Sequence, residues 1–287
     1  GLSPFFAFFI FFDIQSLSCY KALKGGPMVE TLSQLFLNTI KSYPKDNLLL
    51  YKQGGQYLSI STEQVANRVR NISLGLKDLG CESGDKLIIL SENGPDWIMT
   101  DFANLCLGGI TVPIYTSLVA EQIKYIINDS DAKVVVFSSK ELWEKVKAVK
   151  KELKNVKHYI TFQSQPPEGA STLAQIMERG KKIHKENPVL FDQSALNVKP
   201  DDIASIIYTS GTTGIPKGVI LSHANFVSNI KTLASIIYFA KEDMILSFLP
   251  LSHVLERMVT LAFLYKGSSM GYAETMETVA ANLIEIT

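Results

Sequence analysis

The residues best suited to bind a ligand are concentrated in segment 208–223, which reads YTSGTTGIPKGVILSH. Within ten residues it holds four hydroxyl side chains, three glycines and a lysine. Glycine lets the backbone approach a ligand closely, and successive backbone N–H groups in such a loop can bind an anion. We therefore predict a loop that wraps the terminal phosphates of a nucleotide, and a turn without a ligand is the less specific alternative. The residues concerned are Thr209, Ser210, Gly211, Thr212, Thr213, Gly214, Lys217 and Gly218.

Three other motifs do not match the sequence. A Walker A loop requires a Gly-Lys pair followed by Ser or Thr, whereas Lys217 stands between Pro216 and Gly218. The Gly-x-Gly-x-x-Gly fingerprint of dinucleotide-binding proteins is absent. The Gly-x-Ser-x-Gly turn that presents a nucleophilic serine is absent as well, so the sequence indicates no covalent catalysis.

Short apolar runs alternate with helical patterns along the chain and would position this loop. Ser61 and Gln64 fit a capping box at the start of a helix that Gly80 ends. Strands that alternate with helices predict an α/β fold of stacked subdomains, with largely parallel sheets flanked by helices. The loop would then lie at the carboxyl end of a buried strand. We expect strands at 86–90, 110–115, 133–137, 158–162, 203–208, 244–249 and 267–273, a hairpin around 54–55, and helices at 29–43, 61–80, 97–107, around 123–127, at 142–156, from about 225 and from about 254.

The stretch 163–200 interrupts this alternation. It contains Pro166 and Pro167, a short helical pattern around 173–179, and polar residues before the next strand. We interpret it as a surface excursion between two α/β units.

The amino-acid composition limits the classes of protein to which the chain can belong. Apolar residues make up 46% of the 287 residues, which suits a globular chain with a large core. The 28 basic and 28 acidic side chains balance, and no basic run indicates a nucleic-acid surface. Three cysteines without a Cys-x-x-Cys spacing exclude a disulfide framework and suggest no metal site. We expect a cytoplasmic protein, and the sequence predicts no particular oligomeric state.

Residues 1–27 form an apolar leader of doubtful origin. Its run SPFFAFFIFF is too short to span a bilayer, which takes about 20 residues, and no basic residue precedes it as in a secretory signal. The leader is either foreign to the folded protein or the remainder of a membrane anchor, and we favour the first reading. The folded domain is therefore placed at 28–287.

The loop sequence TSGTTGIPKG closely resembles the phosphate-loop motif of the adenylate-forming, or acyl-activating, superfamily. That superfamily includes acyl-CoA synthetases, luciferases and the adenylation domains of peptide synthetases. LPLSHVLER at 249–257 is similar to the segment beside their acyl and nucleotide pocket, in a form most like the long-chain fatty acid–CoA ligases. GDKLIILSENGPDWI, GGITVPIY and GYAETMETVAANL also resemble family segments. The resemblance covers about residues 28–287 and implies an N-terminal AMP-binding domain.

The resemblance also implies roles for residues that match the motifs. Residues 209–214 would line the β- and γ-phosphates of ATP, and Lys217 would neutralise their charge. His253 would lie at the substrate carboxylate and the α-phosphate. We thus expect Lys217 and His253 to act in catalysis, and we assign no metal ligand.

Four other polar or aromatic residues have simpler explanations. His223 follows Ser222 at the start of a helix, where capping explains both residues. Glu256 and Arg257 can form ion pairs, and Trp97 is expected in the core.

The implied reaction uses ATP with Mg²⁺, and then CoA. A fatty acid carboxylate attacks the α-phosphate, pyrophosphate leaves, and the thiol of CoA displaces AMP from the acyl adenylate. Complete members carry further Tyr-Gly-x-Thr-Glu and Thr-Gly-Asp segments and a C-terminal domain with a catalytic lysine, none of which occurs here. We therefore expect a truncated domain that is inactive alone in thioester formation.

Other functions remain open. The chain could belong to an enzyme that adenylates another carboxylate, or it could be a non-catalytic module that binds a nucleotide or an acyl group. A membrane-anchored structural protein would leave the loop unexplained. Loose association with a membrane surface is compatible with a long acyl substrate.

Overall fold

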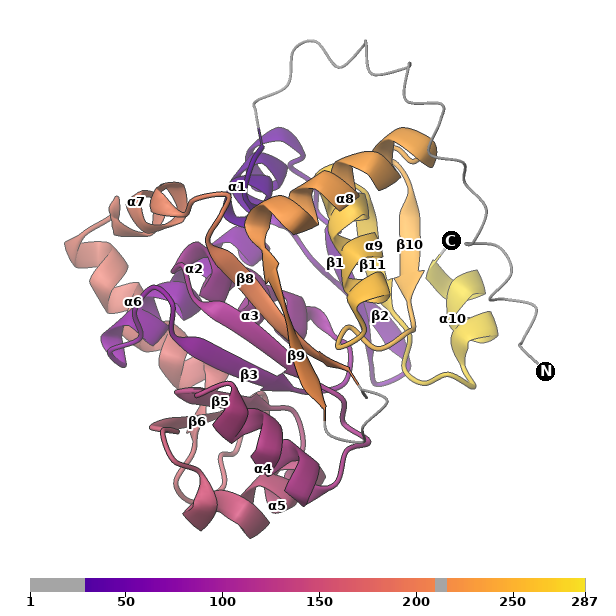
Figure 1. Ribbon diagram of the computed structural model, residues 1–287. Helices are drawn as coiled ribbons and strands as arrows, with labels where there is room; N and C mark the ends of the chain where they lie inside the picture. The colour runs from indigo at the N-terminus through magenta and orange to yellow at the C-terminus, as the bar shows by residue number, and fades with distance from the viewer. Residues whose placement is uncertain (1–28, 210–215, 287) are drawn as a thin grey trace.

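The computed structural model describes residues 29–209 and 216–286, so the leader lies outside the described residues (Figure 1). The strands are β1 (Leu49–Gln53), β2 (Gln56–Ile60), β3 (Lys86–Leu90), β4 (Ile110–Ile114), β5 (Val134–Phe137), β6 (His158–Thr161), β7 (Ser171–Thr172), β8 (Ile203–Thr209), β9 (Lys217–Ser222), β10 (Met244–Ser247) and β11 (Ser269–Tyr272). They form a seven-stranded sheet, in the order β7-β6-β5-β3-β4-β8-β9, and a four-stranded sheet, β10-β11-β1-β2.

Both sheets are largely parallel. Only the β1–β2 and β8–β9 pairs are antiparallel; the other pairs run parallel. The β1–β2 hairpin turns at Gly54 and Gly55, whose φ angles of 60° and 80° require glycine-like freedom. The predicted α/β fold of stacked, mostly parallel sheets is confirmed.

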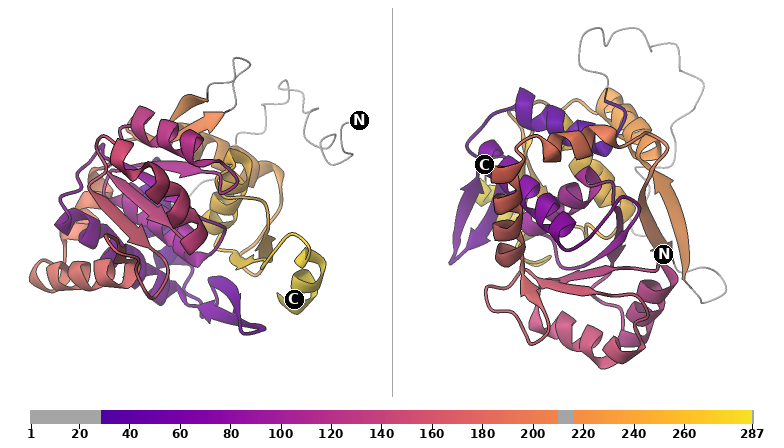
Figure 2. Two further views of the ribbon diagram at one scale, coloured as in Figure 1. Left: turned by 90° about the horizontal axis from the view of Figure 1, so that it is seen from below. Right: turned by 90° about the vertical axis from the view of Figure 1, so that its left-hand side faces the viewer.

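Helices cover both faces of the seven-stranded sheet (Figures 1 and 2). They are α1 (Leu32–Ser42), α2 (Thr62–Asp78), α3 (Pro95–Cys106), α4 (Ala120–Asp129), α5 (Lys140–Val149), α6 (Leu173–Glu186), α7 (Leu190–Asn197), α8 (His223–Ile236), α9 (Val254–Tyr265) and α10 (Val279–Ile286), with a 3₁₀ turn, η3 (Lys150–Glu152). Because strand side chains alternate, Ile88 and Leu90 of β3 pack with α4 and α5. Leu87 and Ile89 face the larger core shared by α1, α2, α3, α6, α8 and α9.

The helix starts follow local sequence. Ser61 and Gln64 form the predicted capping box at the start of α2. Thr172 and Gln175 make the same arrangement before α6. Most predicted elements appear within a few residues of their expected bounds.

The interpretation of 163–200 as a surface excursion is wrong. This stretch adds β7 to the edge of the sheet and forms α6 and α7. Helix α6 packs directly against α2, because glycines let the two backbones meet: a Cβ on Gly75 would collide with Ile176, and one on Gly180 with Asn71. The short helical pattern and the nearby prolines therefore did not indicate that α6 packs against the core.

Two further expectations fail locally. The helix expected to reach residue 156 ends at Val149, because Asn128 bonds the backbone of Glu152 and Lys154 and turns the chain towards β6. No strand was expected between the loop and the helix from about residue 225, but residues 217–222 form β9. Its side chains are mostly exposed, so the buried apolar run typical of a central strand is missing.

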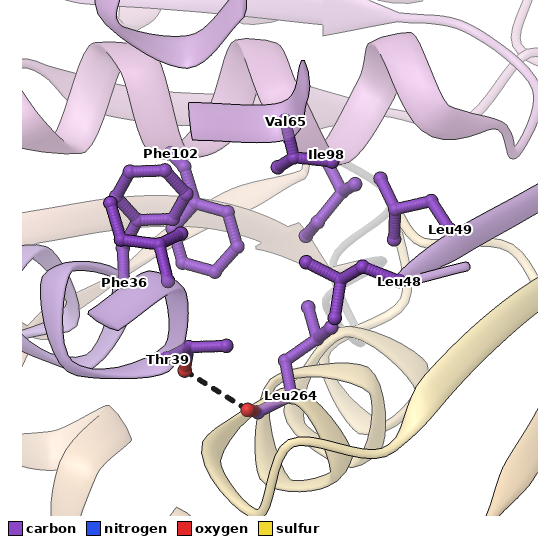
Figure 3. Close-up of a pocket in the computed structure, with 9 residues that line it drawn as sticks. Phe36, Thr39, Leu48, Leu49, Val65, Ile98, Phe102 and Leu264 are labelled. Carbon is purple, nitrogen blue, oxygen red and sulfur yellow. Dashed lines mark hydrogen bonds between the residues drawn. The ribbon is translucent and has the colours of Figure 1, made fainter. Parts of the chain in front are cut away.

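A small apolar cavity lies where α1, α2, α3, β1 and α9 meet (Figure 3). Its volume is about 10 Å³, hardly enough for one water molecule. Thr39 on its border donates a 3.0 Å hydrogen bond to the carbonyl of Leu264. The cavity is a packing void, and an acyl chain cannot bind there.

Candidate functional site

Strands β8 and β9 carry the two ends of the predicted phosphate loop. Thr209, the last residue of β8, pairs across the hairpin with Lys217, the first residue of β9, and both are exposed. The structure therefore brings together the two predicted residues that flank the loop. The predicted residues Ser210, Gly211, Thr212, Thr213 and Gly214 lie outside the described residues.

The next pair, Tyr208 and Gly218, anchors this hairpin. The hydroxyl of Tyr208 donates a 2.6 Å hydrogen bond to Oδ2 of Asp129 at the end of α4, and its ring meets Tyr125 edge-on. Burial, followed by the bond to Asp129, raises the pKa of Tyr208, so the phenol stays a donor. A Cβ on Gly218 would approach Ile206 Cγ2 to 2.7 Å and Tyr208 Cζ to 3.2 Å. Gly218 is thus explained by close packing inside the hairpin, whereas the sequence suggested that it admits a ligand.

His253 is the N-cap of α9 and is exposed. Its Nδ1 accepts a 3.2 Å hydrogen bond from the backbone N–H of Leu255. In the neutral ring the proton is therefore on Nε2, which can donate to a ligand outside the helix. The helix-start interpretation and the ligand interpretation of His253 are compatible, because they use different ring nitrogens.

Asn93 fixes the loop that leads to His253. Its side-chain amide donates to the carbonyl of Leu249 at 2.6 Å and to Oγ of Ser247 at 3.1 Å. Its Oδ1 accepts a 2.8 Å hydrogen bond from the N–H of Leu251. No sequence motif indicates this role of Asn93, since the residue stands in an ordinary loop after β3.

Glu256 holds the same loop from inside α9. It is buried, and its Oε1 accepts a 2.6 Å hydrogen bond from Ser247. Burial raises the pKa of Glu256, while the bonds from Ser247 and from the backbone of Phe248 oppose that rise. Glu256 pairs with a serine and a backbone amide, so it supports the loop and makes no ion pair within the described residues.

The loop ends and His253 border the same edge of the molecule. Strands β3, β4 and β8 are parallel neighbours, so their carboxyl ends lie together. Asn93, just after β3, contacts Ser247 at the carboxyl end of β10, and His253 follows six residues later. Figure 1 shows the end of β8 and the start of α9 on the same lower side of the fold.

Two residues of the helices that follow the loop, α9 and α8, have partners far away in the sequence. Arg257 forms a fully buried ion pair with Asp101 of α3. The sequence had indicated that Arg257 can form an ion pair but not with which residue. Ser222 caps α8 as predicted. Capping does not explain His223, however, because it is buried and its Nδ1 accepts a hydrogen bond from the N–H of Leu32. Only the folded chain brings these residues together.

Residues 36–286 match the family model described as AMP-binding enzyme. The chain belongs to this family. The AMP-binding match includes both flanks of the predicted phosphate loop, the loop after β10 and His253, so the candidate site lies inside the family domain. Trp97 is fully buried, as expected of a core residue.

Relatives within the AMP-binding family are named as fatty acid ligases. The chain is 30% identical over 227 residues to the long-chain-fatty-acid–CoA ligase FadD15 of Mycobacterium bovis, covering 78% of this chain and 37% of the relative. It is 29% identical over 260 residues to the long-chain-fatty-acid–CoA ligase ACSBG2 of Xenopus laevis, covering 88% and 35%. The chain thus spans little more than a third of the length of these relatives.

Solved structures share the fold. The long-chain-fatty-acid–CoA ligase FadD1 of Archaeoglobus fulgidus superposes with a TM-score of 0.75 at 22% identity, over 93% of this chain and 52% of the other. The anthranilate CoA ligase AuaEII, in complex with anthranoyl-AMP, also gives 0.75, at 20% identity, over 90% and 48%. Both comparisons support the AMP-binding domain architecture.

Among residues 29–209 and 216–286, no three His, Cys, Asp or Glu side chains come together as a metal site. In the same part of the chain, no helix has both the length and the hydrophobicity required to cross a membrane.

Proposed function

We propose that this chain provides the ATP- and acyl-binding part of an AMP-forming long-chain fatty acid–CoA ligase. The family membership and the names of the relatives support this proposal. The observation that carries it is the cross-strand pair of Thr209 and Lys217, which holds both ends of the hydroxyl- and glycine-rich loop at one place. A short loop with fixed ends can keep its donors oriented before the ligand arrives.

The loop would act on the charge of the triphosphate. Residues 209–214 would donate hydroxyl and backbone N–H groups to the β- and γ-phosphates, and Lys217 would offset their negative charge. Donors fixed in advance stabilise charge that develops in a transition state, because they need not reorganise during the reaction. Departure of pyrophosphate is the step that such a loop would assist.

His253 would act at the α-phosphate of ATP and the substrate carboxylate, where the bond to the acyl group forms. Its Nε2–H is free of the helix cap and can donate to an oxygen of the carboxylate or of the α-phosphate. Asn93 and Glu256 would keep its helix start in place through the loop after β10. The attack of a fatty acid carboxylate on the α-phosphate would yield an acyl adenylate, and CoA would then displace AMP.

Mg²⁺ has no ligand set among the described residues, and we derive no step through it. The chain lacks the Tyr-Gly-x-Thr-Glu and Thr-Gly-Asp segments that the family resemblance implies for complete enzymes. We therefore propose that this polypeptide alone binds ATP but does not form the CoA thioester. The same proposal includes a cytoplasmic location and peripheral association with a membrane surface.

The proposal is tested by ATP titration of the purified chain. Lys217→Ala should weaken ATP binding roughly ten-fold or more, as expected for losing a charged partner of a phosphate. Lys151→Ala, an equally exposed lysine on η3, is the matched control and should bind ATP like the unchanged chain. Equal affinities in all three proteins would refute the role of the loop.

Non-hydrolysable acyl-adenylate analogues separate the substrate classes. Under the proposal, an analogue with a long alkyl chain raises the melting temperature more than benzoyl or aminoacyl analogues do. A larger shift with benzoyl or aminoacyl groups would assign the chain to another carboxylate. Binding of ATP without any added effect of an acyl group would favour a non-catalytic nucleotide-binding module.

A further inference from the structure

Arg257 and Asp101 form a buried, two-pronged ion pair. Nε of Arg257 donates to Oδ2 of Asp101 at 2.9 Å, and Nη2 donates to Oδ1 at 2.6 Å. Neither side chain is exposed to solvent. This fork geometry is specific to arginine, because lysine offers a single point charge.

The third nitrogen of the guanidinium reaches the strand that carries the phosphate loop. Nη1 of Arg257 donates to Oγ of Ser205 in β8 at 2.7 Å. The hydroxyl of Ser205 in turn donates to the carbonyl of Thr111 in β4 at 2.6 Å. The guanidinium also lies 5.0 Å from the ring centre of Phe226 in α8. One side chain of α9 is thereby bonded to α3 and β8, and packed against α8.

Stability alone does not explain this arrangement. Burying two charges has a large desolvation cost, and apolar residues of similar volume are often as stable as a buried ion pair. A hydrogen bond is directional and an apolar contact is not. A fully hydrogen-bonded polar group therefore fixes the angle and the register at which its two elements pack. The cluster is therefore better suited to hold α9 in one orientation than to add stability.

The cluster lies between the two halves of the candidate site. Arg257 is one helical turn after His253, and Ser205 is four residues before Thr209. A rotation or slide of α9 against β8 would change the distance from His253 to Thr209 at the end of β8. The Arg257–Ser205 hydrogen bond opposes that movement directly.

We propose that Arg257 is a positioning residue that locks α9 to β8 and so fixes His253 relative to Thr209, where β8 ends. The inference rests on the function proposed above for the role of His253 and the loop. Asp101 orients the guanidinium, and Ser205 of β8 accepts a hydrogen bond from it. Arg257 itself does not touch the substrate.

The sharpest variant is Ser205→Ala. It removes the hydrogen bond from Arg257 to β8, together with the bond from Ser205 to Thr111, and leaves the ion pair of Arg257 with Asp101 intact. Ser33→Ala is the matched control: Ser33 is also buried and donates one hydrogen bond, to the carbonyl of Leu105, between α1 and α3. Both variants lose one buried serine hydroxyl. Ser205→Ala breaks two hydrogen bonds and leaves Nη1 of Arg257 without its partner, so it should lower the melting temperature more than Ser33→Ala does.

Hydrogen exchange on the nucleotide-free chain provides the first readout. Ser205→Ala should speed exchange of amides in 218–222 and 255–260 by roughly ten-fold, the equivalent of one such hydrogen bond. Ser33→Ala should leave both segments unchanged. Arg257→Lys should resemble Ser205→Ala, since one ammonium cannot reproduce the fork. Equal exchange in the Ser205 and Ser33 variants would overturn the lock.

ATP affinity is the second readout and separates the two proposals. If Arg257 positions α9 through Ser205, Ser205→Ala weakens ATP binding roughly ten-fold and Ser33→Ala does not, both measured well below their melting temperatures. If the unchanged chain binds no ATP, the proposed function fails, and the exchange experiment alone still decides whether the lock exists. If ATP binds equally to both variants, Arg257 has no positioning role.

Discussion

The imidazole of His223 accepts a 3.1 Å hydrogen bond from the backbone N–H of Leu32, although the two residues are 191 positions apart. The bond ties the first turn of α1 to the start of α8, and both residues are buried. Because Nδ1 is the acceptor, the bond requires a neutral ring. Burial lowers the pKa of His223 to about 4; Asp202 opposes this shift and Arg257 adds to it.

Protonation of His223 should make the fold sensitive to acid. The unfolded chain takes up this proton near pH 6.5 and the folded chain only near pH 4, so stability falls as the pH drops between these values. The loss amounts to about 3 kcal/mol at pH 4. Urea unfolding at a series of pH values measures it.

His223→Gln removes this titration and serves as the control. The variant is less stable at pH 7, but the part of its pH dependence that comes from residue 223 disappears. The lowered pKa values of His158 and His184 would remain as a weaker slope of the same sign. An unchanged slope in the variant would show that His223 does not titrate as the structure requires.

Gly218→Ala should destabilise the hairpin of β8 and β9, which flanks the predicted phosphate loop. The new Cβ would press on Ile206 and Tyr208, and overpacking of this kind costs about 1–3 kcal/mol. Gly94→Ala is the matched control, because nothing lies within 4 Å of its Cβ position. Thermal unfolding compares the two, and similar losses in both variants would disprove the packing explanation.

Asn93→Ala should loosen the loop before α9. It removes three hydrogen bonds to residues 247–251, worth about 2 kcal/mol for a partly exposed side chain. Hydrogen exchange of Leu251 should rise more than that of β3. Asn93→Asp keeps the acceptor for Leu251 and loses the two donors, so Leu251 should stay better protected there than in Asn93→Ala. Equal protection of Leu251 in all three proteins would contradict the role of Asn93.

The two uses of His253 can be separated by substitution. His253→Asn keeps a side chain able to cap α9 and loses the imidazole, whereas His253→Ala loses both. The alanine variant should be about 1 kcal/mol less stable, while the asparagine variant stays near the unchanged chain. Both should bind the long-chain acyl-adenylate analogue more weakly in calorimetry. If only the alanine variant binds more weakly, His253 serves the helix and not the ligand.

Local sequence rules predicted much of the fold. The capping box of Ser61 and Gln64 and the glycine turn at 54–55 are fixed by neighbours in the chain, and both were predicted correctly. Alternating apolar runs likewise located β3, β4 and β5. The packing of α6 on α2 could not be read in this way, because it depends on glycines in two separate helices.

The sequence motifs predict a candidate site, but they give no indication of the contacts that support it. Thr209, Lys217 and His253 were identified through their sequence context, and the structure places them at one edge of the molecule. The partner of Arg257 is 156 positions away, so no spacing rule indicates Asp101. The same holds for Asn93, whose contacts depend on two strands in different sheets.

The central claim is that the segment between Thr209 and Lys217 binds the terminal phosphates of ATP. Backbone amide NMR of the labelled chain during titration with ATP and with AMP tests it most directly. The account predicts large shifts for residues 210–215 with ATP and much smaller ones with AMP, which lacks the β- and γ-phosphates. Saturating ATP that leaves these amides unmoved would contradict it.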